Sequence, residues 1–360
     1  MKKVFEPVVI PLTEKEKTIH MMPIVGIKKS KSIAELAPIP SAMQRLVDAK
    51  NLPDIKNLLS VIWQTNEIHI LFADTGIGKS IYAVALSDSI SKGKPFMGLE
   101  NDNEPLSVLY YDFELSDKQF WKRYSDEFGN LYQFSERFYC GTIDFVELYD
   151  NCSQNEFNAR LFEKICDDIE KRDAKVLVID NISYLDMAST QDKNVSMEIM
   201  RELCRLKKKY SISILVLAHT PKRNQSSPIT KNDLAGSKNL SNFCDSISAI
   251  GQSTKDSSLR YIKQVKPSRS SEIVYDIENV IVCKIVKKGA FLNFELVDYD
   301  SEYEHIQEVS RNEKQMERFN LIEEAKELRI LGHTYEEIAF KLLGSTKKKG
   351  TIYKWLDEKE

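Results

Sequence analysis

A glycine-containing loop, Ala73 to Ser80, carries the residue types that bind phosphate groups. It follows a short alternating apolar run typical of a buried strand, and it precedes a stretch with helical spacing. Gly76 and Gly78 let the backbone turn so that successive N–H groups converge on an anion, and the helix N-terminus adds its positive dipole end. We expect Lys79 to reach the β- and γ-phosphates of a nucleotide and the Ser80 hydroxyl to bind Mg²⁺.

This loop resembles the Walker A motif of P-loop proteins, G-x-x-x-x-G-K-[ST], except that Ala73 stands where the motif has its first glycine. Alanine is the smallest replacement and this position only begins the turn, so we expect a working phosphate loop. The alternative is a turn in which the letters GKS occur by chance. The resemblance implies ATP and Mg²⁺ as cofactors and nucleotide contacts from Asp74, Thr75, Gly76, Ile77, Gly78, Lys79 and Ser80.

Two mostly apolar runs, 174–179 and 212–218, alternate with segments of helical spacing. This pattern is typical of a parallel sheet covered by helices on both faces, in which ligands bind at the carboxyl ends of the strands. Asp180 ends the first run, and beside a phosphate loop it corresponds to the Walker B acid that holds Mg²⁺. The alternative is an acid that only caps a helix or a turn.

Two further polar residues end predicted strands and join Lys79 as catalytic candidates. Hydrolysis needs a carboxylate to orient or deprotonate the attacking water, and Asp180 is engaged by the metal. We therefore predict this role for Glu114, with Asp112 the nearest competitor and a solvated acid as the alternative. His219 is predicted to contact the γ-phosphate and report hydrolysis to the following loop; otherwise it is a histidine without a role.

The order of these segments resembles the RecA-like ATPase core and, more closely, the RepA and DnaB group of hexameric replicative helicases. The resemblance spans about residues 60–298 and is carried by the phosphate loop and the stretches YDFELS, VLVID and LVLAHTPK. It implies an α/β fold with a RecA-like parallel sheet flanked by helices. It also implies single- and double-stranded DNA, further copies of the chain in a hexameric ring, and a primase or initiator protein as partners.

Members of this family complete each site with basic residues from the adjacent subunit. The family pattern K-x-R would fall on Lys266 and Arg269, although one extra residue separates them here, and Lys263 is the rival. A cation supplied by a neighbour would stabilise the charge that develops on phosphate and make hydrolysis depend on assembly. The alternative is a basic strand that only faces solvent.

Two loops after the strands and the end of the chain are candidates for contact with DNA. The loops are Tyr184 to Ser196 and Thr220 to Asn239, and basic side chains in the second suit a nucleic-acid backbone. The stretch 332–356 resembles the helix-turn-helix of resolvases and transposases, and 341–355 holds five lysines and no acid. The alternative for this segment is a helical pair that binds protein. The predicted DNA contacts are Lys222, Arg223, Lys231, Lys238, Lys347, Lys348, Lys349 and Lys354.

Length and composition limit the domain organisation that the chain can have. Its 360 residues allow one large domain with appendages, 42% apolar content is ample for a core, and a net charge of −3 requires nucleic-acid contacts to be local. We predict an extended arm over 1–40, an ATPase core over 41–298 that opens with helix over 41–62, a linker over 299–304 and a helical domain over 305–360. The arm is either disordered or packs on a neighbouring subunit.

Localisation is predicted from what the sequence lacks. No apolar run approaches the roughly 20 residues that cross a bilayer, and the N-terminus lacks the apolar core of a secretory signal. The six cysteines contain no CxxC pair, which favours reduced thiols over disulfides or zinc. We predict a cytoplasmic protein without a membrane partner.

The sequence thus predicts an ATP-driven DNA helicase or translocase of the RepA type that acts in plasmid or mobile-element replication. One alternative is a RecA-like ATPase that loads or regulates without unwinding. The other is a DNA-binding regulator in which ATP serves as a switch.

Overall fold

The computed structural model describes residues 38–145, 147, 156–187, 195–221, 226–234, 237–306 and 311–357, with the backbone alone at 186–187, 195–196, 237–239, 311–318 and 357. The chain divides into two compact units, Met1–Asp54 and Ile55–Glu360. Nearly all of the predicted N-terminal arm lies outside the described residues, as do parts of both predicted DNA loops, at 188–194, 222–225 and 235–236.

In the first unit the structure describes one helix, α1 (Ala42–Ala49). Ser41 caps it by accepting a hydrogen bond from the Gln44 N–H at 3.1 Å. No residue of α1 is buried, and Met43, Leu46 and Val47 are exposed. The predicted continuation of this helix to residue 62 is wrong.

Residues 57–64 form a two-stranded hairpin instead, with β1 (Asn57–Leu59) paired to β2 (Trp63–Gln64). Leu58, Leu59 and Trp63 are at most 1% exposed and pack into one of the two cores of the sheet. Burial of these large side chains in an extended pair outweighs the weak helical tendency of the local sequence.

The centre of the second unit is a nine-stranded sheet with the order β11-β10-β9-β8-β3-β7-β6-β4-β5 in the described chain. Its six parallel strands are β3 (Ile68–Ala73), β4 (Val108–Asp112), β5 (Phe138–Gly141), β6 (Val176–Asp180), β7 (Ser213–His219) and β8 (Ser246–Gln252). An antiparallel extension adds β9 (Leu259–Lys266), β10 (Val280–Lys288) and β11 (Phe291–Asp300). The predicted α/β class, with a parallel sheet flanked by helices, is confirmed, and β10 is a strand that was not predicted.

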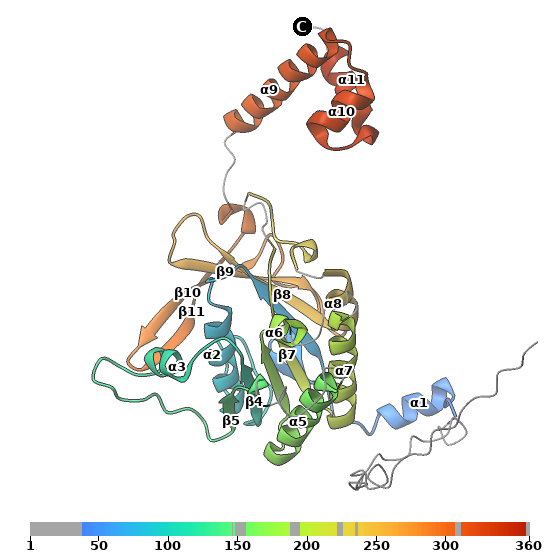
Figure 1. Cartoon of the computed structure of the whole chain (residues 1–360). Coiled ribbons are helices and arrows are strands. Elements are labelled where there is room, and N and C mark those ends of the chain that lie inside the picture. Colours follow the sequence, from blue (N-terminus) through green and yellow to red (C-terminus); the bar gives the residue numbers. More distant parts are fainter. Residues whose placement is uncertain are drawn as a thin grey trace, which may run out of the picture. The chain divides into compact units, whose positions relative to one another are not determined.

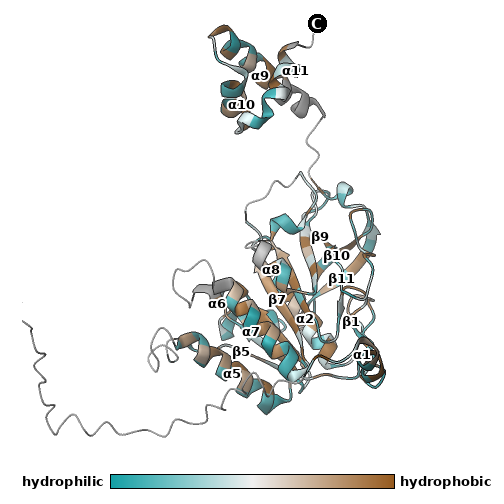
Figure 2. Cartoon of the chain, turned by 90° about the vertical axis from the view of Figure 1, so that its right-hand side faces the viewer, coloured by the Kyte–Doolittle hydropathy of each residue, from teal (hydrophilic) through white to brown (hydrophobic). Residues whose placement is uncertain are grey.

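Helices cover both faces of the parallel strands (Figure 1). One face packs against α5 (Phe157–Arg172), α6 (Ile182–Met187), α7 (Val195–Tyr210) and α8 (Ser237–Phe243), and the other against α2 (Lys79–Ser91) and the β1–β2 hairpin. Strand β3 is buried at every position because Ile70 and Phe72 face the first core while Leu71 and Ala73 face the second. Colouring by hydropathy shows that the central strands are apolar and that helices such as α7 carry both hydrophobic and hydrophilic residues (Figure 2).

Residues 299–304, predicted as a linker, instead complete β11 and form the short 3₁₀ helix η4 (Glu302–Glu304). Glu302 is fully buried and forms an ion pair with Lys263 of β9. Its Oε1 accepts a hydrogen bond from the Ile229 N–H at 2.7 Å, and Lys263 Nζ donates to the Ile229 carbonyl at 3.0 Å. Glu302 therefore fixes the loop after β7 to the sheet.

The C-terminal helices are α9 (Arg311–Ile330), α10 (Tyr335–Leu343) and α11 (Lys349–Asp357), with the 3₁₀ turn η5 (Thr346–Lys348) between the last two. Thr334 and Glu337 form a capping box at the start of α10, and Gly344 ends the helix with φ of 68°. A small core of Ala325, Leu328, Ile338, Ala339 and Ile352 joins the three helices. None of the helices that the structure describes has the length and apolarity to span a membrane.

Candidate active site

The phosphate loop lies between the end of β3 at Ala73 and the start of α2 at Lys79. Both of its glycines have a positive φ, 80° at Gly76 and 110° at Gly78. A Cβ on Gly78 would lie 2.7 Å from Ile285 Cδ1 and 3.1 Å from Phe294 Cζ of the β10–β11 hairpin. Glycine is therefore required at 78 both by the backbone conformation and by close packing of the hairpin.

A basic residue of β9 supports the same loop. Arg260 Nε donates to the Ile77 carbonyl at 3.1 Å, and burial lowers the pKa of this guanidinium. Arg260 was not predicted, because it lies 183 residues from Ile77 along the chain and belongs to no local motif. The contact ties β9 to the phosphate loop through the Ile77 carbonyl.

Lys79 is 7% exposed and points back along the loop. Its Nζ donates to the carbonyls of Ala73 at 2.9 Å and Asp74 at 3.3 Å, and it lies 3.1 Å from His219 Nδ1. Burial lowers the pKa of Lys79, and the charges of Asp180 and Glu114 act in the opposite direction. The loop lysine thus sits within the field of both predicted acids.

Asp180 ends β6 and is 1% exposed. Its Oδ2 accepts a hydrogen bond from the Tyr110 hydroxyl at 2.6 Å, and the Ser80 side chain is a second partner. Burial raises the pKa of Asp180 to about 6, while these two hydrogen bonds act to lower it. The two predicted metal-binding side chains, Ser80 and Asp180, are therefore in contact.

This donor set fits a magnesium nucleotide. Mg²⁺ is usually held by one or two protein oxygens together with phosphate oxygens and waters, rather than by a cage of several acids. The part of the chain that the structure describes contains no cluster of three or more His, Cys, Asp or Glu residues arranged for a metal. One hydroxyl and one carboxylate beside a phosphate loop match this chemistry.

Glu114 and Asp112, the two competing acids, have different environments. Asp112 is buried, and its Oδ1 accepts hydrogen bonds from the N–H groups of Glu114 at 3.0 Å and Leu115 at 2.9 Å. The Glu114 side chain is one third exposed and lies 3.4 Å from His219. Asp112 therefore shapes the turn after β4, and Glu114 is the carboxylate that is open to a water molecule.

His219 connects the lysine and the glutamate. Its Nδ1 lies 3.1 Å from Lys79 Nζ, and its Nε2 lies 3.4 Å from Glu114 Oε1. Asn181 completes the group: its Oδ1 accepts from the Ser183 N–H at 2.9 Å, which turns its Nδ2 toward Glu114 and His219. Asn181 was not predicted, although its place directly after Asp180 was the available signal.

The three candidates for a cation supplied to a neighbour all have partners within their own chain. Lys263 is paired with buried Glu302, and Lys266 Nζ donates to the Ser241 and Cys244 carbonyls at 3.0 and 2.7 Å. In the register between β8 and β9, Lys266 lies opposite Ile247, near the amino end of β8. The phosphate loop follows the carboxyl end of the parallel strand β3, so Lys266 lies at the other end of the strands. Both lysines stabilise their own chain.

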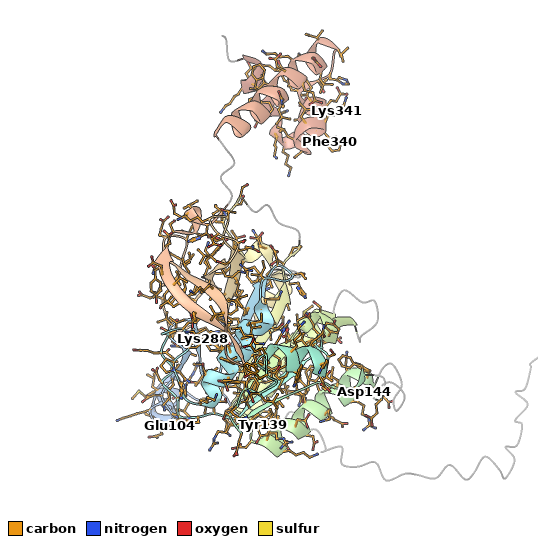
Figure 3. The ribbon with its side chains drawn as sticks, turned by 90° about the vertical axis from the view of Figure 1, so that its left-hand side faces the viewer. Glu104, Tyr139, Asp144, Lys288, Phe340 and Lys341 are labelled. Carbon is orange, nitrogen blue, oxygen red and sulfur yellow. The ribbon has the colours of Figure 1, made fainter. Side chains whose placement is uncertain are left out.

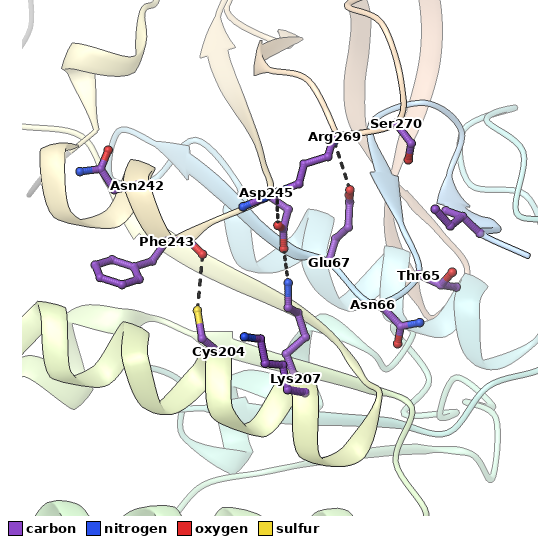
Figure 4. Close-up of a pocket in the computed structure, with 12 residues that line it drawn as sticks. Thr65, Asn66, Glu67, Cys204, Lys207, Asn242, Phe243, Asp245, Arg269 and Ser270 are labelled. Carbon is purple, nitrogen blue, oxygen red and sulfur yellow. Dashed lines mark hydrogen bonds and ion pairs between the residues drawn. The ribbon is translucent and has the colours of Figure 1, made fainter. Parts of the chain in front are cut away.

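Arg269 differs because its side chain is 73% exposed. Its Nε contacts Asp245 Oδ1 at 2.7 Å, and Lys207 reaches Oδ2 of the same carboxylate at 2.6 Å (Figure 4). Asp245 Oδ2 also accepts the Ile68 N–H at 2.9 Å. These residues line a cavity of about 640 Å³ at this edge of the sheet.

The predicted DNA contacts are described in part. Lys231 lies in the 3₁₀ helix η3 (Lys231–Asp233) and is exposed. Lys222 and Arg223 lie outside the described residues, and Lys238 is described by its backbone alone. Lys347, Lys348, Lys349 and Lys354 are all exposed, and Lys349 pairs with Glu336 at 2.7 Å.

Comparisons with known proteins identify a matching family model and a similar solved structure. A family model described as an AAA domain matches residues 35–225, just over half of the chain, including the phosphate loop, Glu114, Asp180 and His219. Among solved structures, the chain is similar to a KaiC-like protein from the hyperthermophilic archaeon Pyrococcus horikoshii OT3, with 12% sequence identity and a TM-score of 0.45. That similarity covers 66% of this chain and 93% of the archaeal chain. The comparison with curated proteins finds no match.

Proposed function

The chain belongs to the AAA domain family, and from this premise we propose that it is an ATP-hydrolysing DNA helicase or translocase of the RepA type. It would act as a hexameric ring in the replication of a plasmid or another mobile element, with a primase or initiator as partner. The observation that best supports hydrolysis is the convergence of Lys79, Asp180, Glu114 and His219 at the carboxyl edge of the sheet.

Each of these side chains has a distinct task in the proposal. Lys79 and the loop N–H groups would bind the β- and γ-phosphates, and Ser80 and Asp180 would hold Mg²⁺, which would neutralise charge on the phosphates. Glu114 orients the attacking water and accepts its proton. Asn181 and His219 hold Glu114 in position, and because His219 also contacts Lys79, it is placed to respond when the γ-phosphate leaves.

The experiment that tests this function is the rate of ATP hydrolysis with and without single-stranded DNA, measured beside the mass of the protein in solution with nucleotide. A helicase should show DNA-stimulated hydrolysis, a mass of several subunits and strand displacement on a forked substrate. Stimulated hydrolysis without displacement would favour a loader. Slow hydrolysis that DNA does not change would favour an ATP-switched regulator and contradict the helicase.

We expect Arg269 to be the cation supplied to the neighbouring subunit. Its Nε is held by Asp245 while most of the side chain is exposed, so its terminal nitrogens are available to another molecule. Arg269→Ala subunits mixed with unsubstituted subunits should lower hydrolysis below the average of the two pure proteins, because each mixed ring contains incomplete sites. Measured rates that follow the average at every mixing ratio would contradict this role.

The matched control is Arg205→Ala on α7. Arg205 is also exposed and pairs with Glu202 at 2.6 Å, but it does not line the cavity beside Asp245. Asp245 keeps Lys207 and the Ile68 N–H when Arg269 is removed, so the Arg269→Ala chain should fold.

We propose that the C-terminal helices bind double-stranded DNA through α11 and the turn before it. Lys347, Lys348 and Lys354 are exposed and have no acidic partner within ion-pair distance in the described chain. Replacing all three with Gln in the full chain should weaken binding and lower the slope of log K against log salt by about 2–3, because each phosphate contact contributes about 0.9. Fluorescence anisotropy across a salt series measures both quantities.

The control for this triple variant is Lys326→Gln on α9, since Lys326 is already paired with Glu323 at 2.9 Å. An unchanged affinity and slope in the triple variant would contradict DNA binding by α11. That outcome would favour protein as the partner, for which exposed Phe340, beside Lys341 on α10, offers an apolar contact (Figure 3).

A further inference from the structure

A cationic pocket lies beside the candidate active site, between α3 (Asp117–Arg123) and the β10–β11 hairpin. It has a volume of about 340 Å³, and it is lined by Leu115, Gln119, Lys122, Arg123, Lys287 and Leu292. Three of these side chains are cations and none is an acid. No residue of the phosphate loop lines it, although Leu115 directly follows Glu114 in the chain.

Arg123 provides the observation that points to a ligand. Its Nη1 is buried and has no hydrogen-bond partner among the described residues. Asp112 lies close enough for the two charges to interact, but Asp112 Oδ1 is occupied by the N–H groups of Glu114 and Leu115. A buried charged donor without an acceptor is costly and uncommon, so an external acceptor at this position explains the arrangement.

Lys287 brings a second cation to the same pocket from the hairpin. Its Nζ donates to the Lys122 carbonyl at 2.9 Å, which fixes the ammonium group beside α3. The next residue, Lys288 (labelled in Figure 3), is paired with Glu295. Lys287 has no acid within ion-pair distance in the described chain, so its charge is not neutralised in the way that the charge of Lys288 is.

We propose that this pocket binds a phosphate group other than those held by the phosphate loop. The guanidinium of Arg123 presents planar paired donors that match phosphate oxygens, and Lys122 and Lys287 add point charges. Leu115 and Leu292 form the apolar part of the lining. The phosphate has two possible sources: inorganic phosphate released beside Glu114, or the backbone of single-stranded DNA. The first source rests on the proposed hydrolysis and the second on the proposed DNA binding.

The test uses direct binding, so that it does not depend on turnover. Two binding measurements are made on the full chain: calorimetric titration with sodium orthophosphate, and anisotropy with a labelled oligothymidylate. Every protein tested carries Lys79→Ala, so any binding by the phosphate loop is the same in all samples. Arg123→Gln and Lys287→Gln should each weaken binding by about tenfold or more, the loss expected for a charge-assisted contact. Lys118→Gln on α3 and Lys288→Gln on β10 are the matched controls and should bind as their parent does.

Each outcome has one meaning. Loss of orthophosphate binding assigns the pocket to the released product, and loss of oligothymidylate binding alone assigns it to the nucleic-acid backbone. The proposal is overturned if neither probe binds the parent, or if Arg123→Gln and Lys287→Gln bind both probes as the controls do. Thermal unfolding of all variants checks the fold, and exposed Lys287 keeps the test valid if Arg123→Gln unfolds. A chain without ATPase activity would refute the proposed function, whereas these binding results would stand separately.

Discussion

Lys79→Ala should lower the affinity for MgATP by roughly 10- to 100-fold, the effect of losing a charged hydrogen-bond donor, and should remove measurable hydrolysis. The lysine is almost fully buried at the start of α2, and its Nζ reaches the Ala73 carbonyl, directly beside the turn where phosphates would lie. Among the hydrogen bonds of the described residues, no other lysine reaches the loop. Calorimetric titration with MgATP measures the affinity, and release of phosphate measures the rate.

The control for this change is Lys94→Ala. Lys94 is exposed in the turn after α2, so the substitution makes the same change in charge far from the loop. An Lys79→Ala chain that bound MgATP as tightly as the Lys94→Ala chain would show that the glycine loop is only a turn. The proposed function would then fail at its first step.

Glu114→Gln should reduce the turnover number by about 10²- to 10⁴-fold, the usual contribution of a general base, and change the affinity for MgATP less than about twofold. The amide keeps the size of the side chain, but it cannot accept a proton. The Glu114 side chain is one third exposed beside His219 and Asn181, whereas Lys79, Ser80 and Asp180 are the residues proposed to bind the nucleotide and its metal. Single-turnover hydrolysis and nucleotide binding, measured on the same sample, separate the two effects.

Asp112→Asn is the comparison that decides between the two acids. An asparagine oxygen can still accept the N–H groups of Glu114 and Leu115, so the turn should persist and most of the turnover should remain. If the Asp112 variant lost turnover while the Glu114 variant kept it, the assignment would be reversed. Loss of MgATP binding in Glu114→Gln would also contradict it.

Local sequence signals predicted the parts of the site that depend on one element each. The phosphate loop follows from glycines between a strand and a helix, and Asp180 and His219 follow from polar residues at the ends of apolar runs. Each of these features depends on residues within a few positions of one another.

The features that the sequence did not reveal depend on contacts between distant residues. Arg260 reaches the loop only because β9 and β8 extend the sheet on that side of β3. The hairpin at 57–64 forms because Trp63 is buried by tertiary packing, which a local helical pattern does not report. Lys266 looks like a free cation until the fold places it against the end of α8. Periodicity and motif spacing contain no information about such partners.

The burial of Glu302 decides where this polypeptide can be shortened. A chain that ended at residue 298, where the composition changes, would lack Glu302. The buried Lys263 ammonium would then have no ion-pair partner, and the Ile229 N–H would have no acceptor. Breaking a buried ion pair from one side costs about 3–5 kcal/mol, a large part of the roughly 5–15 kcal/mol that holds a typical domain together. An excised ATPase core should therefore extend through His305, because the residues just beyond β11 supply the Glu302 carboxylate that holds Lys263 and Ile229 in place.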